Sequence, residues 1–195
     1  LTDQNFIVSP LSTIMYAYDN STDYDTFKTK LGLDSSFMIR TSNPFSDLSS
    51  ASLNKAAVVN TQIMVLHELL NAIHTFETDS AAKVLATSIY NRTETETSLG
   101  DTTFIKNMLA SLDESFSVTS DQLVDLSAGI SAYLQKINAN SSNSHSHFAK
   151  AGITELKTLM SAVMAGTSTS TEIDSLVFNT IDWINTNTSW DGGTI

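Results

Sequence analysis

The feature that most constrains the fold is a long apolar stripe between about residues 52 and 76. Six apolar residues follow one another there at spacings of three and four, the repeat of an α-helix: Ala56, Val59, Ile63, Leu66, Leu70 and Ile73. A second stripe lies beside it, formed by Val58, Val65, Leu69, Ala72 and Phe76. Two adjacent stripes indicate neighbours on two sides. They predict the central helix of a bundle rather than a coiled-coil seam.

The rest of the chain has the same helical character. Gly and Pro, which β-hairpin turns need, are scarce, with seven and two residues. Signals for helix ends stand at Ser9 before Pro10, at Gly32, at Asp101, and at the capping box Thr119 and Gln122. We expect about eight helices, with the fifth reaching Phe116 and the last carrying Ile173 to Ile184. The predicted loops are residues 34–50, 94–100, 138–146 and 167–171.

These elements predict an all-α fold with a single helical domain over residues 1–195. The low-complexity stretch 138–146 is a possible weak boundary. Two helices beyond it could not bury their own apolar faces, which favours one domain. Residues 186–195 resemble a linker, and the chain begins without Met, so we expect a fragment of a larger protein.

Charge narrows the set of partners. The formal net charge is -11, from 21 acidic and 10 basic residues. Nucleic acids and anionic lipid surfaces are bound through clustered Lys and Arg, so neither is an expected partner. No apolar run reaches transmembrane length, which predicts no membrane insertion. The simplest interpretation of the acidic charge is solubility.

The chain has no cysteine. Disulfides, thiolate zinc sites and Cys nucleophiles are therefore excluded. Abundant Ser, Thr and Asn without Cys favours an exported protein, placed outside the cell or on its surface. Four formal N-glycosylation sequons begin at Asn20, Asn91, Asn140 and Asn187.

Histidines are the first candidate metal ligands. His67 and His74 are seven residues apart on the predicted central helix, without the four-residue spacing that binds zinc on one helix face. His145 and His147 lie in a predicted polar loop with no carboxylate nearby. The sequence therefore predicts no metal ligand among them.

A calcium site is the second candidate. Asp19, Ser21, Asp23 and Asp25 alternate like the first ligands of an EF-hand loop. The sixth position is Tyr24 instead of Gly, and the twelfth is Lys30 instead of Glu. The EF-hand interpretation therefore fails. A turn followed by a helix N-cap is predicted, with at most adventitious calcium.

No catalytic or cofactor-binding motif is present. We therefore name no catalytic, cofactor-binding or metal residue and expect a protein that is not an enzyme. Two alternatives stay open. One is a ligand- or glycan-binding helical module, whose candidate pocket residues are Tyr16, Tyr18, Trp183 and Trp190. The other is a hydrolase with an unrecognised site, because a Ser/His/Asp triad is assembled in space.

Three motifs in order carry a resemblance to a known module. They are Ser9-Pro10-Leu11-Ser12-Thr13, then Leu31-Gly32-Leu33-Asp34, and, after Asn43-Pro44-Phe45, the segment Ala56-Ala57-Val58-Val59-Asn60-Thr61-Gln62-Ile63. This set, over about residues 5–140, resembles a helical module of large secreted and surface proteins of bacteria, especially marine ones. The resemblance implies a part of calcium-dependent adhesins or other multidomain exported proteins, and no catalytic residues.

A second likeness is judged coincidental. Asn5-Phe6-Ile7-Val8-Ser9-Pro10-Leu11-Ser12 is similar to the N-terminal motif of serpins, but the chain is far too short and lacks their strand-rich body. The sequence as a whole predicts a structural or adhesive module of an extracellular assembly. Its expected partners are other subunits or domains, and self-association is possible.

Overall fold

The structure is a computed structural model, and it describes the larger part of the chain. The described residues are 8–18, 24–43, 46, 50–73, 80–93, 98–112, 116, 118–139, 145–165, 171, 172, 175 and 179. Within them the fold is all-α, with seven helices and no strand: α1 (Pro10–Ala17), α2 (Tyr24–Lys30), α3 (Ala51–Ile73), α4 (Ser80–Tyr90), α5 (Thr102–Ala110), α6 (Ser120–Ala139) and α7 (His145–Met164). The predicted all-α class is confirmed, and the number of helices is close to the expected eight. The eighth predicted helix, over residues 173–184, lies largely outside the described residues.

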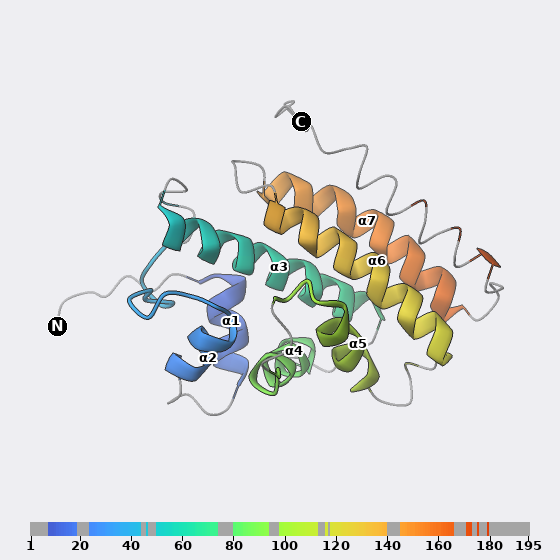
Figure 1. The fold of residues 1–195 in the computed structure, drawn as a ribbon, viewed down its shortest axis with the longest axis horizontal. Helices are drawn as coiled ribbons and strands as arrows, with labels where there is room; N and C mark the ends of the chain where they lie inside the picture. The colour runs from blue at the N-terminus through green and yellow to red at the C-terminus, as the bar shows by residue number, and fades with distance from the viewer. Residues whose placement is uncertain are drawn as a thin grey trace.

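Helix α3 contacts four other helices, α1, α4, α6 and α7. Figure 1 shows α6 and α7 lying side by side along one side of α3, with α1, α2 and α4 on the other side, while α5 packs against α6 and α4. The two stripes of α3 supply buried side chains to both sets of neighbours; Ile63, Leu66 and Leu70 have no exposed surface. No helix among the described residues is long and apolar enough to cross a membrane.

Local sequence signals set several helix ends as predicted. The Ser9 hydroxyl accepts the N–H of Ser12, and the Ser12 hydroxyl accepts the N–H of Ser9, which closes a capping box before Pro10. The Asp101 carboxylate accepts the N–H groups of the first turn of α5. A second capping box joins Thr119 and Gln122 at the start of α6.

Gly32 ends α2 through a Schellman motif. Its φ of 63° is a left-handed conformation that favours glycine. The Leu33 N–H donates to the Lys28 carbonyl at 2.9 Å, and the Gly32 N–H donates to the Thr29 carbonyl at 3.0 Å. This turn directs the chain into the segment 33–43, whose Leu33, Phe37 and Ile39 are buried. The predicted loop therefore contributes to the core.

Three polar residues in the middle of α3 are buried and hydrogen-bonded. Asn60 accepts the N–H of Leu11 at 3.1 Å, which satisfies a donor in the first turn of α1. The Gln62 side-chain amide donates to the Leu134 carbonyl of α6 at 2.9 Å. The Thr61 hydroxyl donates to the Ala57 carbonyl of its own helix. Asn60 and Gln62 thus connect α3 to helices on both of its sides.

Two predicted boundaries are wrong. Helix α5 ends at Ala110 and does not reach Phe116. The Ser111 hydroxyl donates to the Met108 carbonyl at 2.7 Å, a local bond that competes with further helix, while Phe116 is still buried. The expected loop over 138–146 is also too long, because α6 continues to Ala139 and α7 begins at His145. The difference is two residues at each end, which is the usual variation of helix termini.

Candidate docking site

Large exposed hydrophobic side chains are few among the described residues, and they are not scattered. Val8, Tyr16 and Met38 are 88%, 89% and 61% exposed, and Val124 is 44% exposed. The first three line two hollows that share Tyr24, Ile39 and Arg40. Single exposed hydrophobic residues need no explanation, but a group around adjoining hollows is typical of a binding surface.

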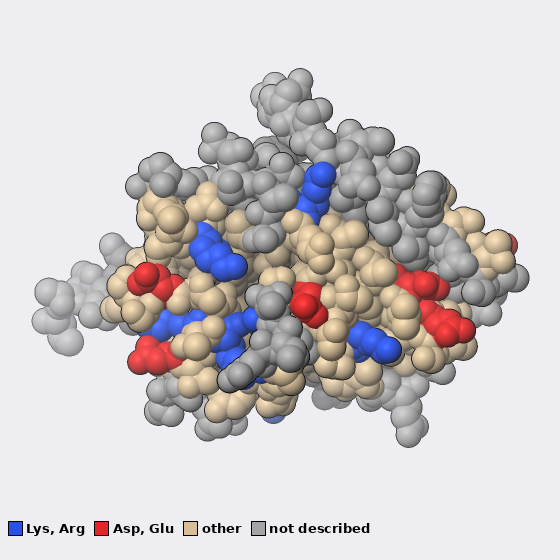
Figure 2. Space-filling view, viewed as in Figure 1, with Lys and Arg blue, Asp and Glu red and all other residues tan. Residues whose placement is uncertain are grey.

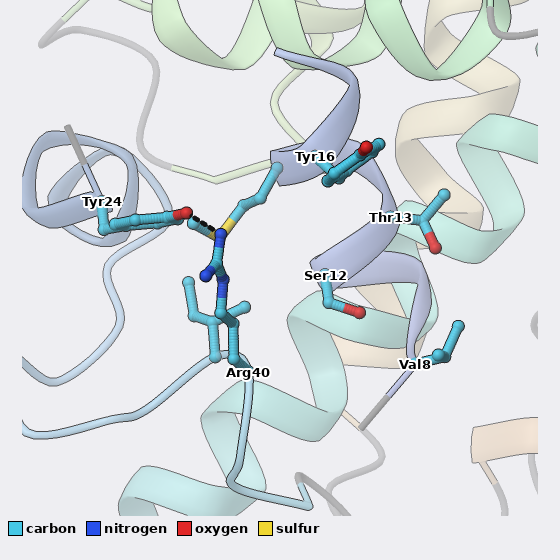
Figure 3. A pocket seen from close by; sticks show the side chains of 8 residues that line it. Val8, Ser12, Thr13, Tyr16, Tyr24 and Arg40 are labelled. Atoms are coloured by element: carbon cyan, nitrogen blue, oxygen red, sulfur yellow. Dashed lines mark hydrogen bonds between the residues drawn. The ribbon is translucent and has the colours of Figure 1, made fainter. Parts of the chain in front are cut away.

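The two hollows adjoin at the three residues that they share: the larger lies between α1 and the segment 39–40, and the smaller lies between α2 and the segment 37–41. Their volumes are about 440 Å³ and about 260 Å³. We define the docking groove by its six principal residues, Val8, Tyr16, Tyr24, Met38, Ile39 and Arg40. In Figure 3, Tyr24 and Arg40 lie on one side of the larger hollow, and Ser12, Thr13 and Tyr16 extend from α1.

The α1 wall follows from helical periodicity. Leu11, Ile14 and Met15 are buried against the core, so Ser12, Thr13 and Tyr16 lie on the other side of the helix. The bond from the Leu11 N–H to Asn60 holds the start of α1 on α3. The position of Tyr16 is therefore fixed by the core beneath it.

The opposite wall is built by α2 and by the segment that follows Gly32. Phe37 and Ile39 are buried, and they alternate with exposed Met38 and Arg40. Lys28 links this segment to α2, because its ammonium donates to the Ser35 carbonyl at 2.6 Å and pairs with Asp25 at 2.8 Å. Met38 and Arg40 therefore lie on a segment that is held by the burial of its neighbouring side chains and by the hydrogen bond from Lys28.

Arg40 is oriented by Tyr24. The guanidinium carbon lies 4.9 Å from the centroid of the Tyr24 ring, a cation–π distance. A guanidinium N–H also donates to the Tyr24 hydroxyl. Tyr and Arg are the residue types that most often dominate protein–protein binding energy, and Met adapts its shape to a partner. The composition of the groove therefore suits a protein partner.

The side chains that the structure describes include nine of the 10 basic residues and seven of the 21 acidic residues of the sequence. They are Lys28, Lys30, Arg40, Lys55, Lys83, Arg92, Lys106, Lys136 and Lys157, against Asp25, Asp34, Glu68, Asp101, Asp121, Asp125 and Glu172. The acidic excess belongs to residues outside this set. The net charge of the sequence is therefore a poor guide to the charge of any one face.

Basic residues cluster around α2, next to the groove. Lys28 and Lys30 belong to α2, and the Lys30 ammonium donates to the Arg92 carbonyl. Burial lowers the pKa of the Lys55 ammonium, and the nearby charge of Arg92 lowers it further. Figure 2 shows Lys and Arg side chains over the part of the molecule where α2 and the beginning of α3 lie, with acidic side chains beside them. Lys28 is paired with Asp25, so the charge that the groove offers to an acidic partner is mainly the Arg40 guanidinium.

The structure separates the four aromatic residues named as pocket candidates. Tyr16 lines the docking groove. Tyr18 does not, because its ring stacks on Tyr90 with the centroids 4.8 Å apart and lies 6.3 Å from Phe27. Trp183 and Trp190 lie outside the described residues. Of the two described tyrosines, Tyr16 thus lines a hollow and Tyr18 packs against other aromatic rings, and the ligand- or glycan-binding role stays a prediction.

Only His67 and Asp25 among the candidate metal ligands have described side chains, and they lie on different helices. His67 lies within 3.2 Å of the Asn71 side-chain amide, and neighbouring Glu68 pairs with Lys157 at 3.4 Å. His145 and His147 belong to the first turn of α7 instead of the predicted loop. Asp25 pairs with Lys28, while His74, Asp19, Ser21 and Asp23 lie outside the described residues. The described part of the chain has no group of three metal-binding side chains.

Sequence reasoning missed Met38, Ile39 and Arg40, because they lie in a segment predicted only as loop. One signal was present: three consecutive apolar residues, Phe37, Met38 and Ile39, stand shortly after the helix-ending Gly32. Comparisons with known proteins find no matching family model, no significantly similar curated protein and no significantly similar solved structure.

Proposed function

We propose that the chain is a non-catalytic structural or adhesive module of an extracellular or cell-surface assembly, and that it joins a neighbouring subunit or domain through the docking groove. The observation that carries this proposal is that exposed Val8, Tyr16 and Met38 line two adjoining hollows, Val8 and Tyr16 the larger one and Met38 the smaller one. Each exposes apolar surface whose removal from water favours association. The export-like composition of the sequence supports the extracellular setting.

The groove is also suited to bind with little loss of conformational freedom. Ile39 is buried, α1 is held by Asn60, and Arg40 is already oriented on Tyr24. Tyr16 has few rotatable bonds for its contact area. A partner therefore meets a surface whose main groups are in place, and more of the contact energy appears as affinity.

The first experiment is to image the native material and to size it in solution. We expect ordered assemblies, and we expect Tyr16→Ser/Met38→Ser to disperse them while Lys106→Ser on α5 leaves them intact. A native protein that is always a lone chain, with no neighbouring subunit or domain on this face, would contradict the proposal. Unchanged assembly in the Tyr16→Ser/Met38→Ser variant would contradict the role of the groove.

A second candidate function, binding of a small polar ligand or glycan, is favoured by a different hollow. This hollow lies between α4 and α5 and has a volume of about 420 Å³. Hydroxyl and amide groups line it above buried Phe104 and Met108: Thr87, Ser88, Asn91 and Asn107. Such groups hydrogen-bond to sugar hydroxyls. A saccharide panel that raises the melting temperature of the protein, but not that of Ser88→Leu, would support this function. No stabilisation by any saccharide would retire it.

A further inference from the structure

The fourth exposed hydrophobic residue of the described part of the chain, Val124, stands in an acidic setting. It lies in the second turn of α6, with Asp121 three residues before it and Asp125 directly after it. Asp121 and Asp125 are four residues apart, and all three residues lie on one face of the helix. Asp121 is exposed. We call these three residues the acidic knob.

The acidic knob and the docking groove are complementary in chemistry. The groove combines exposed apolar surface with the Arg40 guanidinium and the basic cluster around α2. The knob combines an exposed apolar side chain with carboxylates. They are also far apart in the fold: Figure 1 places α2 and the beginning of α6 toward opposite ends of the longest axis. Figure 2 shows acidic side chains over the beginning of α6.

We infer that the occupant of the docking groove is the acidic knob of a second copy of this chain. Val124 enters the apolar hollow, and the Asp121 carboxylate accepts hydrogen bonds from the Arg40 guanidinium. This is a helix laid into a groove, with an apolar anchor and a charge-assisted pair beside it. The inference rests on the proposed function and names the partner of the same surface.

The charges also determine the symmetry of the contact. Two grooves facing each other would place Arg40 and Lys28 of one copy against the same cations of the other, which is unfavourable. A groove that receives a knob uses two different surfaces, so each bound copy still presents one free groove and one free knob. Such a head-to-tail contact closes into a ring or continues into an open filament.

The test is a mixing experiment with the full chain, followed by sedimentation velocity. The groove variant is Tyr16→Ser/Arg40→Ser, the knob variant is Asp121→Ser/Val124→Ser, and the matched control is Lys106→Ser. We expect the unaltered chain and the control to self-associate with rising concentration, less so at high salt. Each double variant is expected to lose at least about tenfold in association constant, because it lacks one side of every contact.

The mixture of the two double variants gives the decisive result. The intact knob of the groove variant fits the intact groove of the knob variant, so we expect one-to-one pairs and nothing larger. Unaltered helical circular dichroism in each variant shows that the loss is not unfolding.

Two results would overturn the inference, and they bear differently on the proposed function. A mixture that forms no pairs leaves the proposed function standing, because a different subunit or domain can occupy the groove. Self-association that survives in both variants shows that assembly uses other surfaces, and it contradicts the role of the groove as well. A chain that stays monomeric at every concentration also overturns the inference. In that case imaging of the native material decides separately whether a different subunit occupies the groove.

Discussion

The middle turn of α3 and the docking groove depart from the usual distribution of residues in opposite ways. In α3, Asn60, Thr61 and Gln62 are polar and only 2–3% exposed. Around the groove, Val8, Tyr16 and Met38 are apolar and mostly exposed. Polar groups inside and large apolar groups outside are the informative exceptions to the general pattern of burial.

The two exceptions have different explanations. Each buried polar side chain in α3 has a hydrogen-bond partner within the fold, so folding alone accounts for it. The exposed apolar side chains of the groove do not stabilise the isolated chain. They contribute favourable free energy only when a partner covers them and removes their apolar surface from water. Substitutions in the first region should therefore change stability, and substitutions in the second should change association.

Asn60→Ala should have the largest effect on stability. It leaves the Leu11 N–H buried without its acceptor and opens a small cavity, which together cost about 2–3 kcal/mol in the free energy of unfolding. Denaturant unfolding measures this loss. The matched control is Asn71→Ala on the exposed surface of the same helix, expected to change the free energy by less than about 0.5 kcal/mol. If the two variants lost the same free energy of unfolding, the hydrogen bond and the burial of Asn60 would not explain its effect.

Gly32→Ala should have a smaller effect than Asn60→Ala, and it tests the turn that carries Met38 and Arg40 into the groove. An alanine at a φ of 63° costs about 1 kcal/mol or slightly more, while space for its Cβ is available beside Lys55. The thermal midpoint measures the change. Gly32→Asn should cost less, since asparagine tolerates this conformation better. A loss of stability that is as large for Asn as for Ala would show that crowding of the side chain, and not backbone conformation, explains the preference for glycine at position 32.

Lys55→Met tests the half-buried charge of the basic cluster. Burial, and then Arg92, lower the pKa of the Lys55 ammonium below its unfolded value. Between the two pKa values the unfolded state binds more protons, so this group makes the chain more stable as the pH rises through that alkaline window. The variant should be more stable than the unaltered chain at pH 7 and should lack this rise. Urea midpoints at pH 7 and in the alkaline range measure both effects, with Lys106→Met as the control. If the stability of the Lys55→Met and Lys106→Met variants depended on pH in the same way, the lowered pKa of the Lys55 ammonium would be contradicted.

Tyr16→Ser should have the smallest effect on stability, within about 0.5 kcal/mol, because its side chain is 89% exposed. Its effect on self-association should nevertheless be clear. Tyr18→Ser, two residues away, should instead affect stability. It removes a ring that stacks on Tyr90, which should destabilise the fold by about 1–2 kcal/mol. Sedimentation and thermal melting of both variants provide the measurement. Destabilisation by Tyr16→Ser as large as that by Tyr18→Ser would assign Tyr16 to the core.

Much of the fold was predictable because helix ends are encoded locally. Ser9, Gly32, Asp101 and Thr119 act within four residues of their own position, and each does what its sequence context indicates. The boundaries that failed depend on longer-range packing. Phe116 is buried although α5 has already ended, and α7 begins earlier than its polar first turn suggests.

The candidate site was much less predictable. Tyr16 and Tyr18 have the same side chain and stand two residues apart, and only the position of α2 and α4 buries one against Phe27 and Tyr90 and leaves the other exposed. The grouping of Val8, Tyr16 and Met38 joins residues 30 positions apart in the chain. No local pattern carries such information, because it depends on which helix faces become neighbours.

The sequence by itself determined the helical class of the described residues, the ends of several helices and the lack of disulfides. Periodicity, caps and composition are local properties, and local hydrogen bonding enforces them. Only the tertiary structure decided that Asn60 is an internal cap for α1, that basic residues cluster around α2, and that an apolar groove opens beside them. The reason is that burial and charge at a surface are set by which segments pack together, and that packing is a property of the whole fold.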